Sequence, residues 1–322
     1  MRMNRLKFVL LAALAAFTLP AAAQSYPTKP VHVIISFTPG SSTDIVGRIV
    51  IQKLTEIWGQ PVVPENRAGA GGSIGSAVVA KAAPDGYTLL INSNAHSVNP
   101  VIYAKLPYDT VKDFTEIAPL AIQPNVFVVP ADAPYKTLGD FIKAAKAKPG
   151  SLNIGHAGVG SGTHLTTEKF IAATQVKVTE IPFKGTPEVI AAMFSGDVHA
   201  YWAPISAAMA LIKGGKLRAL AVSTPKRNAQ LPDVPTPSEA GAKGAESPLW
   251  FGLWGPAGMD AQLVSKINAD VRKALADRAV KERLIQTGND TMDMSPQEFT
   301  KLVRTEMQDY TRVLKAAGVK PQ

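Results

Sequence analysis

Short apolar segments with strand character alternate with longer segments of helical character along most of this chain, and the alternation occurs in two series. The first series starts with VHVIIS at residues 31–36 and reaches YTLLI at 87–91. The second follows a proline-rich passage and runs from VFVV at 126–129 to LRALAV at 217–222. Strands that alternate with helices form sheets with parallel neighbours. The pattern therefore predicts two α/β halves, which suits 322 residues because that length exceeds one average domain.

A loop rich in proline, serine and glycine, residues 224–248, separates the second series from three amphipathic helices. These helices have no strands of their own, so we assign them to the first half. The chain would then cross between the halves twice, near Ile122 and near Ala245, which predicts two lobes that can close on a ligand as a hinge. We expect the first lobe to comprise residues 24–122 and 246–322, and the second to comprise residues 123–245. The expected helices are 261–276, 279–287 and 295–317, the last with a capping-box spacing from Ser295 to Glu298.

The first 23 residues have the features of a secretory signal peptide. Arg2, Arg5 and Lys7 precede an apolar run that ends at Pro20, and Ala21-Ala22-Ala23 provides an A-x-A cleavage site. The run is shorter than the roughly 18 to 20 apolar residues of a membrane anchor. We therefore expect cleavage near Ala23 and a soluble protein in the periplasm. Cleavage leaves 31 basic against 25 acidic residues, so the net charge falls from +9 to +6.

Composition and spacing exclude several kinds of site. The sequence has no cysteine, so disulfides, thiolate metal sites and cysteine nucleophiles are ruled out. Its five histidines show no metal-ligand spacing and its carboxylates show no catalytic pair, so we expect neither a metal nor catalytic residues. The basic residues are spread along the chain without interleaved aromatic residues, which argues against nucleic acid as a partner.

The glycine-rich segment 69–75 permits two weak enzymatic interpretations. As a dinucleotide fingerprint it fails, because Ile74 stands where G-x-G-x-x-G requires glycine, and we expect no cofactor. As G-x-S-x-G it would make Ser73 the nucleophile of an exported hydrolase, but no apolar strand runs into Gly71. A flexible connection in which Ser73 caps the next helix is the simpler interpretation.

Two loops rich in glycine, serine and threonine are the strongest candidates for a binding site. Phe37–Asp44 follows the first strand, and His156–His164 follows the strand LNIG in the second half. Free backbone N–H groups and the positive end of the helix dipole bind anions at such strand-to-helix turns. Similar loops also serve only as helix caps. Their occurrence in both halves favours an anion site between the lobes, and Lys184, before another helix, is either a further charge at that site or a solvated lysine.

Several segments taken together resemble the Bug (TctC-like) receptors of tripartite tricarboxylate transporters. The resemblance covers essentially the whole chain after the leader, in order, and rests on VHVIISFTPGSSTDIVGR (31–48), ENRAGAGG (65–72), APDGYTLL (83–90), GSGTH (160–164), LRALAV (217–222), DVPTPSEAG (233–241) and WFGL (250–253). It implies a two-lobed, type II-like periplasmic binding protein, a Venus flytrap that closes on a small carboxylate. It also implies delivery to a membrane permease of one large and one small subunit. We expect the receptor itself to be a monomer.

The resemblance also implies, position by position, which residues bind the ligand. These are Phe37, Thr38, Pro39, Gly40, Ser41, Ser42, Thr43, Asn92, Ser93, Ala95, Gly160, Ser161, Gly162, Thr163 and His164, with Lys184, Gly185 and Thr186 nearby. Much of the contact in this family is made by main-chain amides and ordered water.

Two departures from the family pattern bear on the ligand. Ser41 stands where the family usually has a second glycine, and Ala203-Pro204 follow Trp202 where relatives commonly have an aspartate that suits an amino group. We therefore expect a mono- or dicarboxylate and not an amino acid, with Trp202, Ala203 and Pro204 at the site. An aromatic ligand would fit if Trp202 and Phe37 flank it, although core packing is an equal alternative for both side chains.

The solute-receptor hypothesis accounts for the leader, the two lobes and the paired loops together. Two alternatives stay open from the sequence. One is an exported serine hydrolase that uses Ser73. The other is a ligand-sensing receptor that docks on a membrane kinase instead of a permease.

Overall fold

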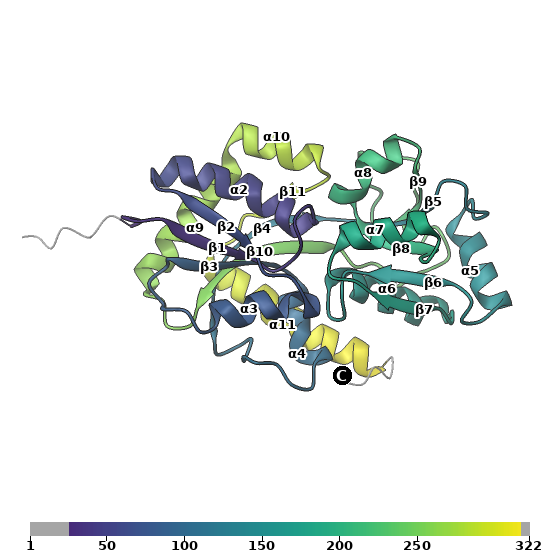
Figure 1. Ribbon diagram of the computed structural model, residues 1–322, viewed down its shortest axis with the longest axis horizontal. Coiled ribbons are helices and arrows are strands. Elements are labelled where there is room, and N and C mark those ends of the chain that lie inside the picture. The colour runs from purple at the N-terminus through teal and green to yellow at the C-terminus, as the bar shows by residue number, and fades with distance from the viewer. Residues whose placement is uncertain (1–25, 317–322) are drawn as a thin grey trace, which may run out of the picture.

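Two sheets, each covered by helices, make up the fold of the computed structural model, which describes residues 26–316 (Figure 1). The first sheet has the strand order β11-β4-β10-β3-β1-β2, and the second has the order β7-β6-β8-β5-β9. The predicted α/β fold with two lobes is confirmed. The predicted signal peptide lies outside the described residues.

The first sheet is mixed, although the sequence pattern predicts parallel neighbours. β1 pairs in parallel with β2 and β3, whereas β10 lies antiparallel between β3 and β4. Its strands are β1 (Val31–Ile35), β2 (Val62–Asn66), β3 (Thr88–Ser93), β4 (Phe114–Gln123), β10 (Leu249–Pro256) and β11 (Asp290–Thr291). Its helical segments are α2 (Ser42–Trp58), η1 (Ala70–Gly72), α3 (Ser73–Val79), α4 (Ala95–Ile102), α9 (Ala261–Ala276), α10 (Arg278–Gln286) and α11 (Pro296–Ala316).

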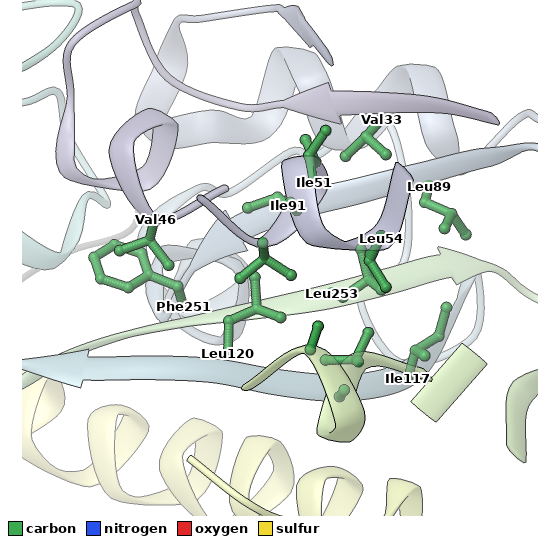
Figure 2. Close-up of a cluster of buried hydrophobic side chains, with 14 of the residues drawn as sticks. Val33, Val46, Ile51, Leu54, Leu89, Ile91, Ile117, Leu120, Phe251 and Leu253 are labelled. Carbon is green, nitrogen blue, oxygen red and sulfur yellow. The ribbon is translucent and has the colours of Figure 1, made fainter. Parts of the chain in front are cut away.

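The larger core of this lobe lies between the first sheet and the helices α2 and α9. Figure 2 shows Val46 of α2 beside Phe251 of β10, and Leu54 of α2 beside Leu253 of β10, all of them buried. On the opposite face Trp254 of β10 packs with Phe299 of α11. Because aliphatic and aromatic side chains on both faces of the sheet are removed from water, the strands at its centre are apolar throughout.

The second sheet is also mixed and is built on a smaller core. β6 is parallel to β7 and β8, whereas β5 is antiparallel to β8 and β9. Aromatic packing of Phe127 with Phe141 and Trp202 forms the centre of this core. The elements are β5 (Asn125–Pro130), α5 (Leu138–Ala147), β6 (Asn153–His156), α6 (Gly162–Thr174), β7 (Thr179–Pro182), α7 (Thr186–Ser195), β8 (Ala200–Pro204), α8 (Ile205–Lys213) and β9 (Leu217–Val222).

Side-chain caps fix where the C-terminal helices α9 and α11 begin. The Asp260 side chain accepts hydrogen bonds from the amides of Gln262 and Leu263 and begins α9. At the start of α11 the amide of Ser295 donates to Glu298 Oε2 across 2.8 Å, and the amide of Glu298 donates to Ser295 Oγ across 3.2 Å. This reciprocal pair is the predicted capping box. Among the helices of residues 26–316, none is both long enough and apolar enough to cross a membrane.

Two adjacent crossovers join the lobes. One is Pro124 between β4 and β5, and the other ends at Pro248, immediately before β10. They are tied together by Ser223, whose Oγ accepts from the amide of Asn125 at 2.8 Å and donates to the carbonyl oxygen of Ser247 at 2.9 Å. Any rotation of one lobe against the other must pass through these two segments.

We expect Ser223→Ala to lower the free energy of unfolding by about 1 to 3 kcal/mol, because Ser223 is buried and its loss leaves the amide of Asn125 without its acceptor. Urea unfolding measures this change. Ser265→Ala is the control, since that hydroxyl is exposed and bonds only within its own helix turn. Equal stabilities of the two variants would contradict the bridging role of Ser223.

Candidate ligand-binding site

A small cavity, with only about 20 Å³ of free volume, lies between the lobes, at the ends of strands from both sheets. The loop after β1 and the start of α2 form one wall, together with the end of β3 and the start of β10. The loop after β6 and the starts of α6 and α7 form the facing wall, together with the end of β8. The lining residues are Phe37, Ser41, Ser42, Thr43, Ser93, Leu249, Ala157, Ser161, Gly162, Thr163, Thr186 and Pro204.

The same capping device opens the helix on each side of this cavity. Ser41 precedes α2 with φ −69° and ψ 160°, and Ser161 precedes α6 with φ −68° and ψ 158°. Each hydroxyl accepts from the amide three residues later, that of Asp44 and that of His164. Because each serine oxygen accepts a hydrogen bond as a cap, both hydroxyls lie beside first-turn N–H groups that favour an anion.

A third helix begins at the cavity without a side-chain cap. α7 starts at Thr186 after Gly185, which has no side chain to accept from the first amides. Thr186 Oγ1 lies 2.9 Å from the hydroxyl of Tyr201, a fully buried residue of β8. Burial raises the pKa of Tyr201, so the phenol stays protonated and fixes the Thr186 side chain.

The lining contains no charged side chain. Asp44 lies beside the cavity wall and accepts from the amide of Gly40 at 2.9 Å, from Arg48 at 2.7 Å and from Asn66 at 2.9 Å. These contacts hold the loop after β1 in shape, in keeping with Asp44 as a first-turn helix acid and not a general base. The cavity therefore offers an anion neutral donors: hydroxyl groups and the positive ends of helices.

Ten of the predicted site residues line the cavity: Phe37, Ser41, Ser42, Thr43, Ser93, Ser161, Gly162, Thr163, Thr186 and Pro204. Eleven do not: Thr38, Pro39, Gly40, Asn92, Ala95, Gly160, His164, Lys184, Gly185, Trp202 and Ala203. Of these, Thr38 contacts the other lobe, because its Oγ1 lies 3.4 Å from Oε2 of Glu188 in that lobe. Lys184 is exposed, and Asn92 is buried with its amide on Ser76 Oγ.

Trp202 belongs to the core of the second lobe. Its side chain is fully buried, and its ring centroid lies 5.0 Å from that of Phe127 and 5.9 Å from that of Phe170. Of the two interpretations of this tryptophan, core packing is therefore the one that fits its position.

Sequence reasoning missed Ala157 and Leu249. Ala157 directly precedes the glycines of the second loop, whereas Leu249 carries no chemical signal.

Ser73 opens α3 and does not line the cavity. In the same helix Ser76 Oγ meets His96 Nδ1 at 3.4 Å, but Ser76 is fully buried and its hydroxyl donates to the carbonyl of Gly72. Burial lowers the pKa of His96 to about 3. Within the described residues this arrangement gives Ser73 no histidine partner.

A larger groove of about 490 Å³ lies beside the crossovers and is lined by residues such as Pro124, Arg227 and Asn289. Much of that volume is open to solvent, and the groove does not meet the loops after β1 and β6. The cavity between the lobes, where several helices begin, is therefore the better candidate site.

Comparison with known proteins places this architecture among binding proteins. The family of tripartite tricarboxylate transporter receptors matches residues 46–319. Protein BugT of Bordetella pertussis is 33% identical over 324 residues, which is 99% of each chain.

Three solved structures resemble the whole fold. The periplasmic binding protein BugD has a TM-score of 0.88 and 30% identity, with 92% of this chain and 100% of that chain covered. Rpa4515 of R. palustris with adipate has a TM-score of 0.89 and 34% identity, with 92% of this chain and 100% of that chain covered. MatC of Rhodopseudomonas palustris with bound malate has a TM-score of 0.86 and 32% identity, covering 90% and 100%.

Proposed function

This chain belongs to the tripartite tricarboxylate transporter receptor family, and we propose that it captures a small aliphatic dicarboxylate between its lobes in the periplasm. The observation that carries the proposal is the pair of serine-capped helix starts, Ser41 before α2 and Ser161 before α6, which line one cavity from opposite lobes. A dicarboxylate presents one anionic group to each lobe. Binding at both ends therefore stabilises the closed arrangement, as hinge closure requires.

The shape and chemistry of the cavity support an aliphatic ligand body. Phe37, Pro204 and Leu249 are the larger apolar residues of the lining, whereas Trp202 packs in the core and cannot provide a second aromatic face. No acidic side chain lines the cavity to pair with an amino group. Adipate and malate, the ligands of two related structures, are both aliphatic dicarboxylates.

We propose that the first lobe consists of residues 24–122 together with residues 246–322. The second lobe consists of residues 123–245. The strand pairing supports this division, because β1 to β4 pair with β10 and β11 whereas β5 to β9 pair among themselves. The proposed partner is a membrane permease of one large and one small subunit, to which the closed monomer delivers its ligand. A pull-down of permease subunits and of membrane kinases, with and without ligand, tests which of these partners is recruited.

Calorimetric titration with succinate, malate, adipate, benzoate and a set of amino acids tests the ligand class. We expect the aliphatic dicarboxylates to bind most tightly, with compaction of the protein seen by X-ray scattering. Tight binding of amino acids alone would overturn the proposal. So would dicarboxylate binding without compaction, because the two-lobe contact is its physical basis.

We expect Ser41→Ala and Ser161→Ala each to weaken dicarboxylate binding about tenfold or more, since a hydrogen bond to a charged group contributes roughly 1.5 to 3 kcal/mol. Thr137→Ala is the matched control. Thr137 caps α5 in the same way, through the amide of Asp140, but does not line the cavity. All three variants lose a helix cap, so only an affinity loss confined to the two serines supports direct contact.

A further inference from the structure

A cluster of histidine and glutamate side chains lies in the second lobe, behind the wall of the cavity. His156 ends β6, His164 lies in the first turn of α6, and Glu180 lies on the edge strand β7. One ligand-type atom from each of the three lies within 4.8 Å of the others. Glu168, one helical turn after His164, lies beside this group, with its Oε1 3.5 Å from His164 Nε2.

The spacing of these atoms is close to that of a metal site. His164 Nε2 is 3.5 Å from Glu168 Oε1 and 3.7 Å from Glu180 Oε2. Ligands at about 2.0 to 2.2 Å from a tetrahedral zinc ion stand about 3.3 to 3.6 Å apart. The rings of His156 and His164, with centroids 4.5 Å apart, converge on the same region.

The cluster is buried and leaves polar atoms without partners. His156 is 1% exposed and His164 is 4% exposed. Neither Nδ1 of His156 nor Oε2 of Glu180 has a hydrogen-bond partner. Among the residues that the structure describes, neither Glu168 nor Glu180 forms an ion pair with lysine or arginine. Unpartnered buried groups of this kind are uncommon in proteins and call for an explanation such as an ion.

We propose that His156, His164 and Glu180, with Glu168 as the fourth ligand, bind one divalent transition-metal ion of the zinc type. Two imidazoles and carboxylate oxygens suit zinc in a closed, four-coordinate site. The sequence spacing predicts no metal here, because the ligands come from a strand, a helix and a second strand and share no short motif.

One hydrogen bond must change when the metal binds. Nδ1 of His164 accepts from the amide of Gly160 at 3.3 Å, which leaves the proton of the neutral ring on Nε2. Coordination through Nε2 moves that proton to Nδ1, so the hydrogen bond from the Gly160 amide is lost.

Titration of the untagged, chelator-treated protein with ZnCl₂ and CoCl₂ tests the proposal. We expect one equivalent of zinc to bind and Co²⁺ to give the visible absorption of a tetrahedral complex. Glu180→Gln and His164→Gln should weaken zinc binding at least about tenfold. His32→Gln is the control for surface histidines, because His32 is exposed and lies on β1 of the other lobe.

Absence of stoichiometric zinc binding would overturn the proposal, and so would an octahedral Co²⁺ spectrum. Equal affinities of Glu180→Gln and the wild type would do the same. If His164→Gln fails to fold, Glu168→Gln replaces it, since that side chain lies on the outer part of α6. Thermal melting of each metal-free variant confirms that the comparison is made between folded proteins.

Discussion

Replacing Gly71 by alanine is expected to weaken dicarboxylate binding about a hundredfold while the protein still folds. Gly71 belongs to the first lobe, in η1, and faces the loop after β6 of the second lobe. A Cβ atom at this position would lie 2.2 Å from the carbonyl oxygen of Val159 and 3.1 Å from the carbonyl carbon of Gly160. Both are backbone atoms and cannot rotate away, so the lobes must separate to admit a methyl group.

The size of this effect follows from the closure equilibrium. Overpacking against fixed atoms costs up to about 3 kcal/mol. That cost applies only to the closed arrangement, in which the Tyr103 hydroxyl also donates to the Val159 carbonyl across 2.7 Å. Because each 1.4 kcal/mol is about tenfold in affinity, the ligand that closes the lobes binds about a hundredfold more weakly.

Gly59→Ala provides a matched control. Gly59 ends α2 in the same lobe with φ 61°, close to the 58° of Gly71, but a Cβ atom there would have no neighbouring side chain or backbone segment within 4 Å. Both substitutions therefore carry the same left-handed backbone penalty, of roughly 1 to 2 kcal/mol. Calorimetry should show wild-type affinity for Gly59→Ala. Equal affinities of the two variants would show that this contact between lobes plays no part in binding.

Local chemistry explains most of what could be predicted from the sequence. The expected helix 261–276 coincides with α9. Its start depends only on nearby residues, because the Asp260 side chain caps amides two and three positions further along the chain. Ser41 and Ser161 could be placed at helix starts for the same reason. The antiparallel entry of β10 between β3 and β4 could not be predicted, because that pairing joins segments more than a hundred residues apart. Leu249 reaches the cavity through this pairing.

Trp202 was ambiguous for a different physical reason. All five residues of β8 are buried, since helices and loops cover both faces of the second sheet. A strand buried on both faces does not alternate between polar and apolar residues, so its sequence does not tell which face a side chain occupies. The zinc-type cluster escaped prediction because its residues, 156, 164 and 180, meet only after β6, α6 and β7 have packed.

Glu306 of α11 is a partly buried acid that the binding function does not require. Its Oε1 accepts from Trp250 Nε1 at 2.8 Å, and its Oε2 has no hydrogen-bond partner. Burial raises the pKa of Glu306 to about 7, the negative charge of Asp309 adds to the rise, and Lys169 of α6 and the Trp250 hydrogen bond oppose it. The desolvation of the carboxylate therefore outweighs its partners.

Glu306→Gln is consequently expected to raise the free energy of unfolding at pH 8 by about 3 kcal/mol and to leave it nearly unchanged at pH 4.5. The folded protein holds the proton of Glu306 up to about pH 7, whereas the unfolded chain releases it near 4.5. Between these values the unfolded state binds fewer protons, so the stability due to this group falls as the pH rises, by 1.36 kcal/mol for each pH unit. Glutamine keeps the acceptor for Trp250 and has no proton to lose.

Urea unfolding of both proteins from pH 4.5 to pH 8 measures the difference directly, and subtraction removes the contribution of every other titrating group. Glu282→Gln, on the exposed face of α10, is the control and should change stability by less than about 0.5 kcal/mol at either pH. A loss of stability in Glu306→Gln at pH 8 would mean that the attraction between the Glu306 carboxylate and the Lys169 charge outweighs desolvation. In that case the contact between α11 and α6 is held by charge, and the ionised carboxylate stabilises the closed lobes instead of opposing them.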